Sequence, residues 1–386
     1  MKKICSLATL PITVKYFMLG NLNYLAENGY DCYCICNNNT ELTPELLGKV
    51  KYIPMEIKWG YVSLKDFVLC TYRMYKIFKK EKFDIIQYAT FNAGLSACVA
   101  GWLARVPVRI NLQWGVSYPI YTGKQRIFRR AVHKLMCMLA TNVQPDSFAN
   151  LKFCVEDGLY SADKACVIYN GSACGADLQK FDISKKQDWK TEVLEELGIG
   201  EYNRIFGYVG RIVKEKGISE LIAAFREMND FSSYLVLVGP MDENPRIDDE
   251  LMKWAKEQKN VFFTGPKSNP AKYFASFDYM MLPSYQEGFG MTVVEASALG
   301  VPPIITNIKG PTDLVTDGVN GFVCEVKSVD SLLATMKKAA ALSNEDYSKM
   351  CATAYQIAKD KFDSVEYKKR FLENRNMLLE KAGVRK

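Results

Sequence analysis

Residues 279–296 read YMMLPSYQEGFGMTVVEA and combine three local patterns in one segment. The first four residues are apolar, as in a strand that is buried on both faces. A glycine-rich loop follows them, and the apolar spacing from residue 291 onward is typical of a helix. A strand, a loop and a helix in this order form the repeating unit of a parallel α/β sheet. The segment therefore predicts such a sheet for this part of the chain.

The same alternation extends along the chain in two series separated by a polar stretch at residues 182–190. The expected strands cover residues 3–8, 31–36, 84–88, 108–112 and 165–169, then 204–209, 234–239, 260–264, 279–283 and 303–306. The expected helices between them include residues 16–28, 72–82, 93–104, 124–134 and 217–228. The pattern predicts two doubly wound, Rossmann-like domains that face an interdomain cleft, where ligands bind beyond the carboxyl ends of the strands. The first domain covers residues 1–180 and the second 181–363, and a helix within residues 364–386 crosses back to the first.

The composition is that of an ordinary globular protein. Of the 386 residues, 48% are hydrophobic and 24% are charged, which excludes a disordered chain. The longest nearly apolar stretch, residues 95–104, is about half as long as a membrane-spanning helix. Residues 4–12 resemble a secretory signal, but Pro11 and Lys15 interrupt the run, so a buried strand is favoured. We therefore expect a cytoplasmic protein.

The twelve cysteines show no CxxC pair of the kind that holds a metal. Cys32, Cys34 and Cys36 alternate along an expected strand and would share one of its faces. We expect them to be reduced, buried side chains that pack as small hydrophobic groups. No metal and no other cofactor is expected.

Positive charge is concentrated in the first half of the chain. Residues 1–180 hold 22 Lys and Arg against 13 Asp and Glu, whereas residues 181–386 hold 28 against 30. Much of the excess falls in the two expected basic helices, residues 72–82 and 124–134. The second of them contains Arg126, Arg129, Arg130 and Lys134, interleaved with Ile127, Phe128 and Val132.

Two interpretations of this basic pattern stay open. Basic amphipathic helices bind anionic membrane surfaces, which predicts a peripheral protein on the inner face of the plasma membrane, with Ile127, Phe128 and Val132 inserted at the interface. A solvated helix face would give the same pattern. Nucleic acid is not an expected partner, because no recognition motif accompanies the charge.

Residues 207–217, GYVGRIVKEKG, follow an expected strand and precede an expected helix. Their glycines permit a close approach of the backbone, and Arg211 and Lys216 carry positive charge to the start of the helix. A diphosphate fits these features. The spacing differs from the GxGxxG and GxxxxGK[ST] motifs, so a dinucleotide fingerprint and a P-loop are both disfavoured.

Two acids flank the Gly-Phe-Gly sequence of the opening segment. Glu287 lies in the loop, and Glu295 falls about one and a half turns into the helix that follows. Carboxylates accept hydrogen bonds from vicinal hydroxyls, and loop amides bind further oxygens. This group of residues suits a sugar and a ribose bound together.

The second half of the chain resembles the donor domain of family-4 retaining glycosyltransferases with the GT-B fold. The resemblance rests on residues 207–217, on LVLVGP at 235–240, on FFTG at 262–265, on residues 282–304, and on DGVNGF at 317–322. The first half is similar more loosely, through DIIQYATFNAG at 84–94, VPVRINLQWG at 106–115 and VIYNGSACGADLQKF at 167–181. The last of these segments is similar to a segment of bacterial surface-polysaccharide transferases.

The resemblance implies a role for each matching residue. Arg211 and Lys216 would bind the donor diphosphate, and these two residues with Glu287 would carry the catalysis. Glu295 would hold the nucleotide ribose. The donor would also contact Gly210, Thr264, Gly265, Pro266, Lys267, Gly288, Phe289 and Gly290, the loop at 264–267 lying against the base.

The first half departs from the family pattern at positions that many relatives fill with histidine. Gln87 and Trp114 stand there, and we assign these two residues, with Gly115, to the acceptor side. His133 is the single histidine, and we expect it to be a surface or packing residue. No side chain is then an obvious general base, but in a retaining transferase the departing phosphate can accept the proton.

The resemblance implies a metal-independent, retaining hexosyl- or N-acetylhexosaminyl-transferase. The donor would be a nucleotide-sugar, expected to be UDP-linked. The acceptor would be a hydroxyl of a growing surface glycan, such as a capsule or O-antigen chain, expected to be linked to undecaprenyl lipid. Two alternatives stay open: a GT-B nucleotide-sugar epimerase, and a GT-B partner subunit that binds without turnover.

Overall fold

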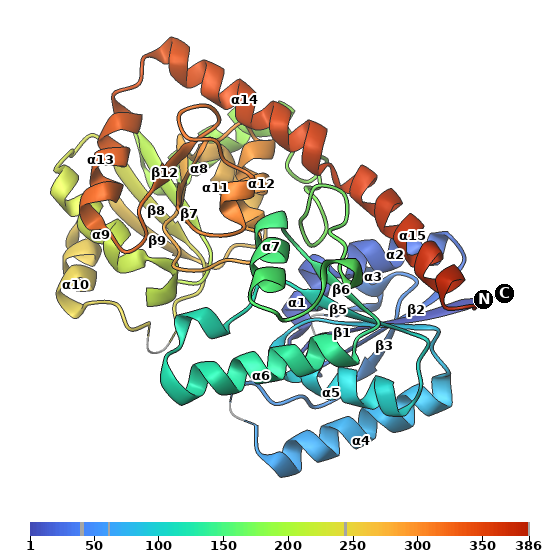
Figure 1. Cartoon of the computed structure of the whole chain (residues 1–386). Coiled ribbons are helices and arrows are strands. Elements are labelled where there is room, and N and C mark those ends of the chain that lie inside the picture. The colour runs from blue at the N-terminus through green and yellow to red at the C-terminus, as the bar shows by residue number, and fades with distance from the viewer. Residues whose placement is uncertain (39–41, 61, 243–244, 385–386) are drawn as a thin grey trace. The chain divides into compact units, whose positions relative to one another are not determined.

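The computed structural model describes residues 1–38, 42–60, 62–242 and 245–384, which divide into two compact units (Figure 1). Unit 1 contains residues 1–174 and the C-terminal helix from Val365 onward. Unit 2 contains Gly175–Ser364. The boundary between them lies a few residues before the one expected from the sequence.

Unit 1 is built on a six-stranded parallel sheet with the strand order β3-β2-β1-β4-β5-β6 in its described residues. Its strands are β1 (Lys2–Leu7), β2 (Tyr30–Cys36), β3 (Lys51–Pro54), β4 (Ile85–Tyr88), β5 (Val108–Gln113) and β6 (Asn142–Pro145). Its helices are α1 (Pro11–Phe17), α2 (Leu19–Glu27), α3 (Pro44–Leu47), α4 (Leu64–Glu81), α5 (Phe91–Leu103), α6 (Gly123–Leu139), α7 (Phe148–Glu156) and α15 (Ser364–Lys381).

Helices cover both faces of this sheet because successive residues of a strand point to opposite faces. On β1, Ile4 packs in a cluster with residues of α1, α2 and α15. The next residue, Cys5, packs in a second cluster with residues of α4, α5 and α6. Cys32, Cys34 and Cys36 all belong to the first cluster. Burial raises the pKa of each of these thiols, which confirms that they pack as small hydrophobic groups.

Unit 2 repeats the topology of unit 1, with the order β12-β11-β10-β7-β8-β9 in a parallel sheet. Its strands are β7 (Ile205–Val209), β8 (Tyr234–Val238), β9 (Val261–Gly265), β10 (Tyr279–Leu282), β11 (Pro303–Thr306) and β12 (Phe322–Cys324). Its helices are α8 (Lys186–Leu197), α9 (Ile218–Met228), α10 (Asp249–Glu257), α11 (Pro270–Ser276), α12 (Met291–Ala298), α13 (Val329–Ala340) and α14 (Asn344–Phe362). The α/β fold class with two doubly wound units is confirmed.

One local prediction is wrong, because the expected strand at 165–169 forms only an isolated bridge between Ala165 and Val143. The polar stretch at 182–190 includes the start of α8 at Lys186, a helix that packs against α11. Strands β3, β6 and β12 were not expected from the sequence.

The C-terminal helix α15 carries a buried arginine into unit 1. Arg375 is fully buried, and its guanidinium donates to Gln87 Oε1 at 2.8 Å and to Gln144 Oε1 at 2.6 Å. It also lies over the ring of Phe371 at 3.8 Å. Burial lowers the pKa of Arg375 to about 10. The helix expected over residues 364–381 therefore forms and is held in unit 1 by polar as well as apolar contacts.

Candidate active site

The sheet of unit 2 reverses its strand order between β7 and β10. Strands β8 and β9 lie beyond β7, whereas β11 and β12 lie beyond β10. Ligands of open α/β sheets bind beyond the carboxyl ends of the strands at such a point. The loops that leave β7 and β10 here are residues 210–217 and 283–290, the two motifs singled out in the sequence.

A glycine brings these two loops into contact. Gly217 has φ +70°, and a Cβ atom there would lie 2.0 Å from the carbonyl oxygen of Pro283. A side chain is therefore excluded at this position. The Tyr285 amide donates to the Glu215 carbonyl at 3.0 Å, and this hydrogen bond also joins the two loops. The loop after β7 contains a short 3-10 turn at Lys214–Lys216 before α9 begins.

Lys216 and Glu287, both predicted as site residues, meet directly. Lys216 Nζ lies 2.6 Å from Glu287 Oε1, and the Ser284 hydroxyl donates to the same oxygen at 2.7 Å. Both charged side chains are mostly buried, with 25% and 14% of their areas exposed. A charged pair at low exposure is weakly screened by solvent. The pair therefore presents a cation and an acid side by side at the point where the strand order reverses.

Arg211 follows β7 and is more exposed than Lys216. Its Nη1 atom lies 3.3 Å from Asp242 Oδ2, and the two side chains are 57% and 43% exposed. The Tyr208 hydroxyl donates to the Arg211 carbonyl at 2.8 Å and holds this part of the loop. The sequence analysis gave no role to Asp242 or Ser284. Only the structure shows that Asp242 contacts Arg211 and that Ser284 contacts Glu287.

The remaining residues of the second motif have mixed environments. The Phe289 side chain is 3% exposed and packs against Phe362, so only its backbone is available to a ligand. Gly290 has φ +90° and precedes α12. Glu295 lies in the second turn of α12. Burial raises the pKa of the Glu295 carboxyl to about 7, and Lys180 has the opposite effect.

The expected base-binding segment at 264–267 begins inside a strand. Thr264 and Gly265 are the last residues of β9, and the Gly265 carbonyl accepts from the Gly239 amide at 3.0 Å. Lys267 points to Glu196, with a separation of 2.7 Å between Nζ and Oε1. Gly210 donates its amide to the Val238 carbonyl at 2.9 Å. The contacts of these residues with a nucleotide, and those of Pro266 and Gly288, stay predictions.

Comparison with known families identifies the two halves of the chain. Residues 190–357 match the family "Glycosyl transferases group 1", and residues 3–147 match "Glycosyl transferase 4-like". The chain is a glycosyltransferase, and its two doubly wound units have the GT-B fold. The glycosyltransferase is 27% identical over 342 residues to the capsular polysaccharide biosynthesis glycosyltransferase CapM of Staphylococcus aureus, and 87% of each chain is covered.

Two further comparisons extend over most of the chain. The glycosyltransferase is 25% identical over 355 residues to an Escherichia coli enzyme named UDP-Gal:alpha-D-GlcNAc-diphosphoundecaprenol alpha-1,3-galactosyltransferase, with 86% of each chain covered. Anabaena Alr3699/HepE, solved in complex with UDP-glucose, superposes with a TM-score of 0.80 at 18% identity and covers 98% of this chain and 100% of its own. The latter likeness supports the fold.

Unit 1 of the glycosyltransferase holds the residues assigned to the acceptor side. Gln87 is 1% exposed, donates to the Ser6 hydroxyl at 2.6 Å and accepts from Arg375. Its side-chain amide is engaged in this network, and its assignment to the acceptor side stays a prediction. Trp114 packs on Phe17 at a ring distance of 5.7 Å, and Gly115 has φ +80°. Their acceptor-side role stays a prediction.

His133 is a packing residue, as expected. It is 8% exposed and lies between the rings of Phe91 and Tyr118, at centroid distances of 5.5 and 5.8 Å. Burial and the neighbouring Arg129 lower the pKa of His133 to about 4. A histidine that is neutral and enclosed at pH 7 is poorly suited to exchange protons with a substrate.

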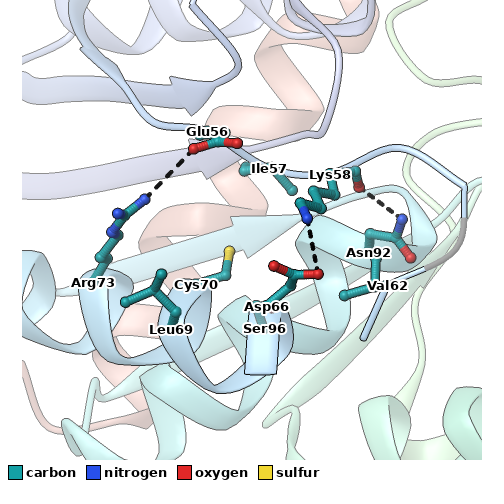
Figure 2. Close-up of a pocket in the computed structure, with 10 residues that line it drawn as sticks. All are labelled: Glu56, Ile57, Lys58, Val62, Asp66, Leu69, Cys70, Arg73, Asn92 and Ser96. Carbon is teal, nitrogen blue, oxygen red and sulfur yellow. Dashed lines mark hydrogen bonds and ion pairs between the residues drawn. The ribbon is translucent and has the colours of Figure 1, made fainter. Parts of the chain in front are cut away.

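A pocket lies in unit 1 between the chain that follows β3 and the helices α4 and α5 (Figure 2). Its lining holds two acids and two bases, which are paired. Lys58 Nζ lies 3.0 Å from Asp66 Oδ2, and Arg73 Nη1 lies 3.9 Å from Glu56 Oε2. Asn92 on α5 donates to the Lys58 carbonyl at 2.8 Å. Because these charges balance, the pocket suits uncharged groups that bear hydroxyls better than it suits a phosphate.

The four bases expected at a membrane surface differ in their contacts. Arg130 forms a 2.7 Å ion pair with Asp157, and the Arg129 guanidinium lies 4.1 Å from the Tyr121 ring centroid. Arg126 and Lys134 are exposed. Val132, expected to insert into the membrane, is 8% exposed and packs between α6 and the sheet, so that expectation is wrong.

The Glu295 carboxyl provides a pH test of the donor site. If this carboxylate binds the ribose, UDP affinity should fall as the pH drops below 7, because protonation removes the charged acceptor of the two hydroxyls. The fall should approach about tenfold per pH unit well below the pKa. Calorimetry from pH 5.5 to 8 on the wild type and on Glu295→Gln isolates the effect, since UDP ionises alike in both titrations. The variant should bind UDP weakly with a flatter profile; parallel profiles would exclude Glu295 from the ribose site.

Proposed function

We propose that this glycosyltransferase transfers a hexosyl or N-acetylhexosaminyl group from a UDP-sugar to a hydroxyl of a lipid-linked surface glycan. The proposal includes retention of the anomeric configuration and no requirement for a metal ion. The pairing of Lys216 with Glu287 is the observation that supports it most strongly, and Arg211 lies in the same loop after β7 as Lys216. Two cations at the place where the strand order reverses suit a diphosphate, and the adjacent acid suits the hydroxyls of the transferred sugar.

The proposed reaction is a displacement on one face of the sugar. The acceptor oxygen forms a bond to the anomeric carbon, and the bond from that carbon to the phosphate oxygen breaks with its electron pair going to phosphate. The proton of the acceptor hydroxyl passes to the same phosphate oxygen, so UDP is released. Arg211 and Lys216 stabilise the charge that develops on the departing phosphate, which is the work that a divalent ion does in other transferases.

The nature of the acceptor is inferred from the relatives. The Escherichia coli relative is named for transfer to a diphosphoundecaprenol-linked N-acetylglucosamine. A Campylobacter jejuni relative, 27% identical over 279 residues with 70% of each chain covered, is named for transfer to a diphospho-undecaprenol-linked sugar. A membrane-bound acceptor requires the enzyme to reach the bilayer surface. No helix in the described part of the chain is long and apolar enough to cross a membrane.

A donor panel tests the proposed reaction. UDP-galactose, UDP-glucose, UDP-N-acetylglucosamine and UDP-N-acetylgalactosamine would each be incubated with the wild type and N-acetylglucosaminyl-diphosphoundecaprenol, with and without EDTA. We expect one donor to give a longer lipid-linked glycan whose new linkage is α, at a rate that EDTA leaves unchanged. Inversion at C2 or C4 of the free donor would indicate an epimerase. Thermal stabilisation without turnover would indicate a binding subunit.

We also propose that unit 1 binds anionic membranes through α4 and α6. Both helices pack against α5 and cover the same face of the sheet (Figure 1). On α6, Ile127 and Phe128 are 71% and 65% exposed beside the exposed base Arg126. On α4, Leu64 and Val68 are 77% and 56% exposed. Exposed apolar side chains flanked by bases are typical of helices that lie in a lipid interface.

Neutralising the exposed bases of α6 should weaken membrane binding. The double variant Arg126→Gln, Lys134→Gln leaves the Arg130 ion pair intact, and each base contributes about 1 kcal/mol near an anionic surface. We expect the partition coefficient on phosphatidylglycerol vesicles to fall by about 10- to 30-fold in a co-sedimentation assay. The exposed pair Lys253→Gln, Lys256→Gln on α10 is the control and should bind as the wild type does. If the wild type does not co-sediment at low salt, the membrane proposal fails.

A further inference from the structure

Two threonines occupy the place in unit 1 where the strand order reverses. Thr9 follows β1 and Thr90 follows β4, and these strands are neighbours in the sheet. They correspond by topology to β7 and β10 of unit 2, whose loops carry Lys216 and Glu287. Neither threonine was assigned a role from the sequence, although Thr90 lies in the segment at 84–94. In unit 1 they therefore hold the position at which doubly wound sheets bind their ligands.

The hydrogen bonds of the pair leave one hydroxyl proton without an acceptor among the described residues. The two hydroxyl oxygens are 2.8 Å apart, and Thr90 Oγ1 also accepts from the Thr9 amide at 3.1 Å. Thr9 is 1% exposed and its oxygen accepts from the Ala93 amide at 3.4 Å. Since a buried hydroxyl needs an acceptor for its proton, Thr9 donates to Thr90. The Thr90 hydroxyl then has two donors and, within the described residues, no acceptor for its own proton.

Thr90 is also held in a strained backbone conformation. Its φ is +64° and its ψ is +154°, a combination that glycine adopts readily and that a β-branched residue almost never adopts. A glycine here would relieve the strain but would carry no hydroxyl. Strain of this kind persists where the surrounding structure imposes it, and it is concentrated at functional sites.

We propose that Thr90 donates a hydrogen bond to the attacking hydroxyl of the acceptor, and that Thr9 is the positioning residue that turns the Thr90 proton outward. This rests on the proposed function, because the ligand is the alcohol group of an acceptor sugar. A hydroxyl oxygen has two lone pairs. One accepts from Thr90 while the other attacks the anomeric carbon, and the hydroxyl proton is left to pass to the departing phosphate.

Three replacements of Thr90 distinguish the effect of its hydroxyl group from the effect of its backbone strain. With the active donor of the panel and N-acetylglucosaminyl-diphosphoundecaprenol, Thr90→Ala should lower kcat/KM for the acceptor by about 10- to 100-fold. Thr90→Ser keeps the hydroxyl and should stay within about threefold of the wild type. Thr90→Gly should lose transfer as the alanine variant does, yet its Tm should exceed that of Thr90→Ala by about 2 to 4 °C, because both variants lose the hydroxyl and only glycine relieves the backbone strain. UDP affinity and donor hydrolysis by water should be unchanged in all three. Thr122→Ala, an exposed threonine of unit 1 without a side-chain cap contact, is the control.

Several outcomes would overturn the proposal. Wild-type transfer by Thr90→Ala would remove the hydroxyl from the reaction. Donor hydrolysis that falls in parallel with transfer would show that Thr90 does not act on the acceptor. A Tm of Thr90→Gly that is no higher than that of Thr90→Ala would show that the backbone is not strained. If the proposed function is wrong, the wild type itself will not transfer a sugar to this acceptor. This result differs from every outcome that contradicts the role of Thr90.

Discussion

Replacing Lys216 by alanine should lower kcat by about 10²- to 10³-fold, which is about 2.7 to 4 kcal/mol of transition-state stabilisation. Negative charge on the departing phosphate grows as the bond to the sugar breaks, so a cation there stabilises the transition state more than the bound substrate. Lys216 is 25% exposed, so solvent screens it less than it screens Arg211, which is 57% exposed. We therefore expect Arg211→Ala to lose about 2 to 3 kcal/mol, the smaller effect of the two.

The measurement is a pair of numbers for each variant: kcat under saturating donor, and the Kd for UDP by calorimetry. Loss of transition-state charge stabilisation predicts a large fall in kcat and a smaller change in Kd. Lys214→Ala is the matched control, because Lys214 lies in the same 3-10 turn and its side chain is exposed. A wild-type kcat in Lys216→Ala would remove this residue from the site.

The order of strands and helices could be predicted from the sequence where burial alone decides it. The expected strand at 303–306 coincides with β11, whose residues are all buried. The same signal fails at 165–169, where Ile168 is 4% exposed although the segment forms no strand. Apolar residues in a sequence indicate burial, but they do not indicate whether a neighbouring strand is available for pairing.

Strand β6 was missed for the opposite reason. Its sequence, Asn-Val-Gln-Pro, alternates polar and apolar residues, yet Gln144 is 5% exposed. The side chain is tolerated there because it accepts from Arg375, more than 200 residues later in the chain. A buried polar group is satisfied by tertiary contacts that no local pattern contains.

The candidate site also combines contacts that the sequence could predict with contacts that only the structure shows. Lys216 and Glu287 lie in motifs that follow strands, so their meeting at the carboxyl edge follows from the topology. Asp242 reaches Arg211 from the chain after β8, and Thr9 meets Thr90 across 81 residues. Asp242 and Thr9 lie outside the quoted motifs, and Thr90 lies in the segment at 84–94 without an assigned role. The motifs therefore contain the two charged residues that meet at this edge, and the structure supplies the neighbours that they contact.

Replacing Glu287 should separate sugar transfer from nucleotide binding. We expect Glu287→Ala to lower transfer by about 100-fold, because its proposed partners are hydroxyls of the transferred sugar, whose contacts orient the reacting carbon. UDP affinity should stay within about threefold of the wild type or become tighter, since removing the carboxylate frees the Lys216 ammonium for the phosphate. Glu287→Gln keeps the shape of the side chain and should lose transfer through the loss of charge.

The comparison with Glu295→Gln makes the division testable within one assay. UDP calorimetry at pH 8 should show weak binding in Glu295→Gln and near-normal binding in Glu287→Ala, while transfer assays at saturating donor should show the greater defect in Glu287→Ala. Because Ser284 also donates to Glu287, Ser284→Ala serves as the matched variant that leaves the carboxylate in place, and its transfer rate should fall by only a few-fold. Equal losses of UDP affinity in the two acid variants would mean that both carboxylates bind the nucleotide, and the sugar contact assigned to Glu287 would be wrong.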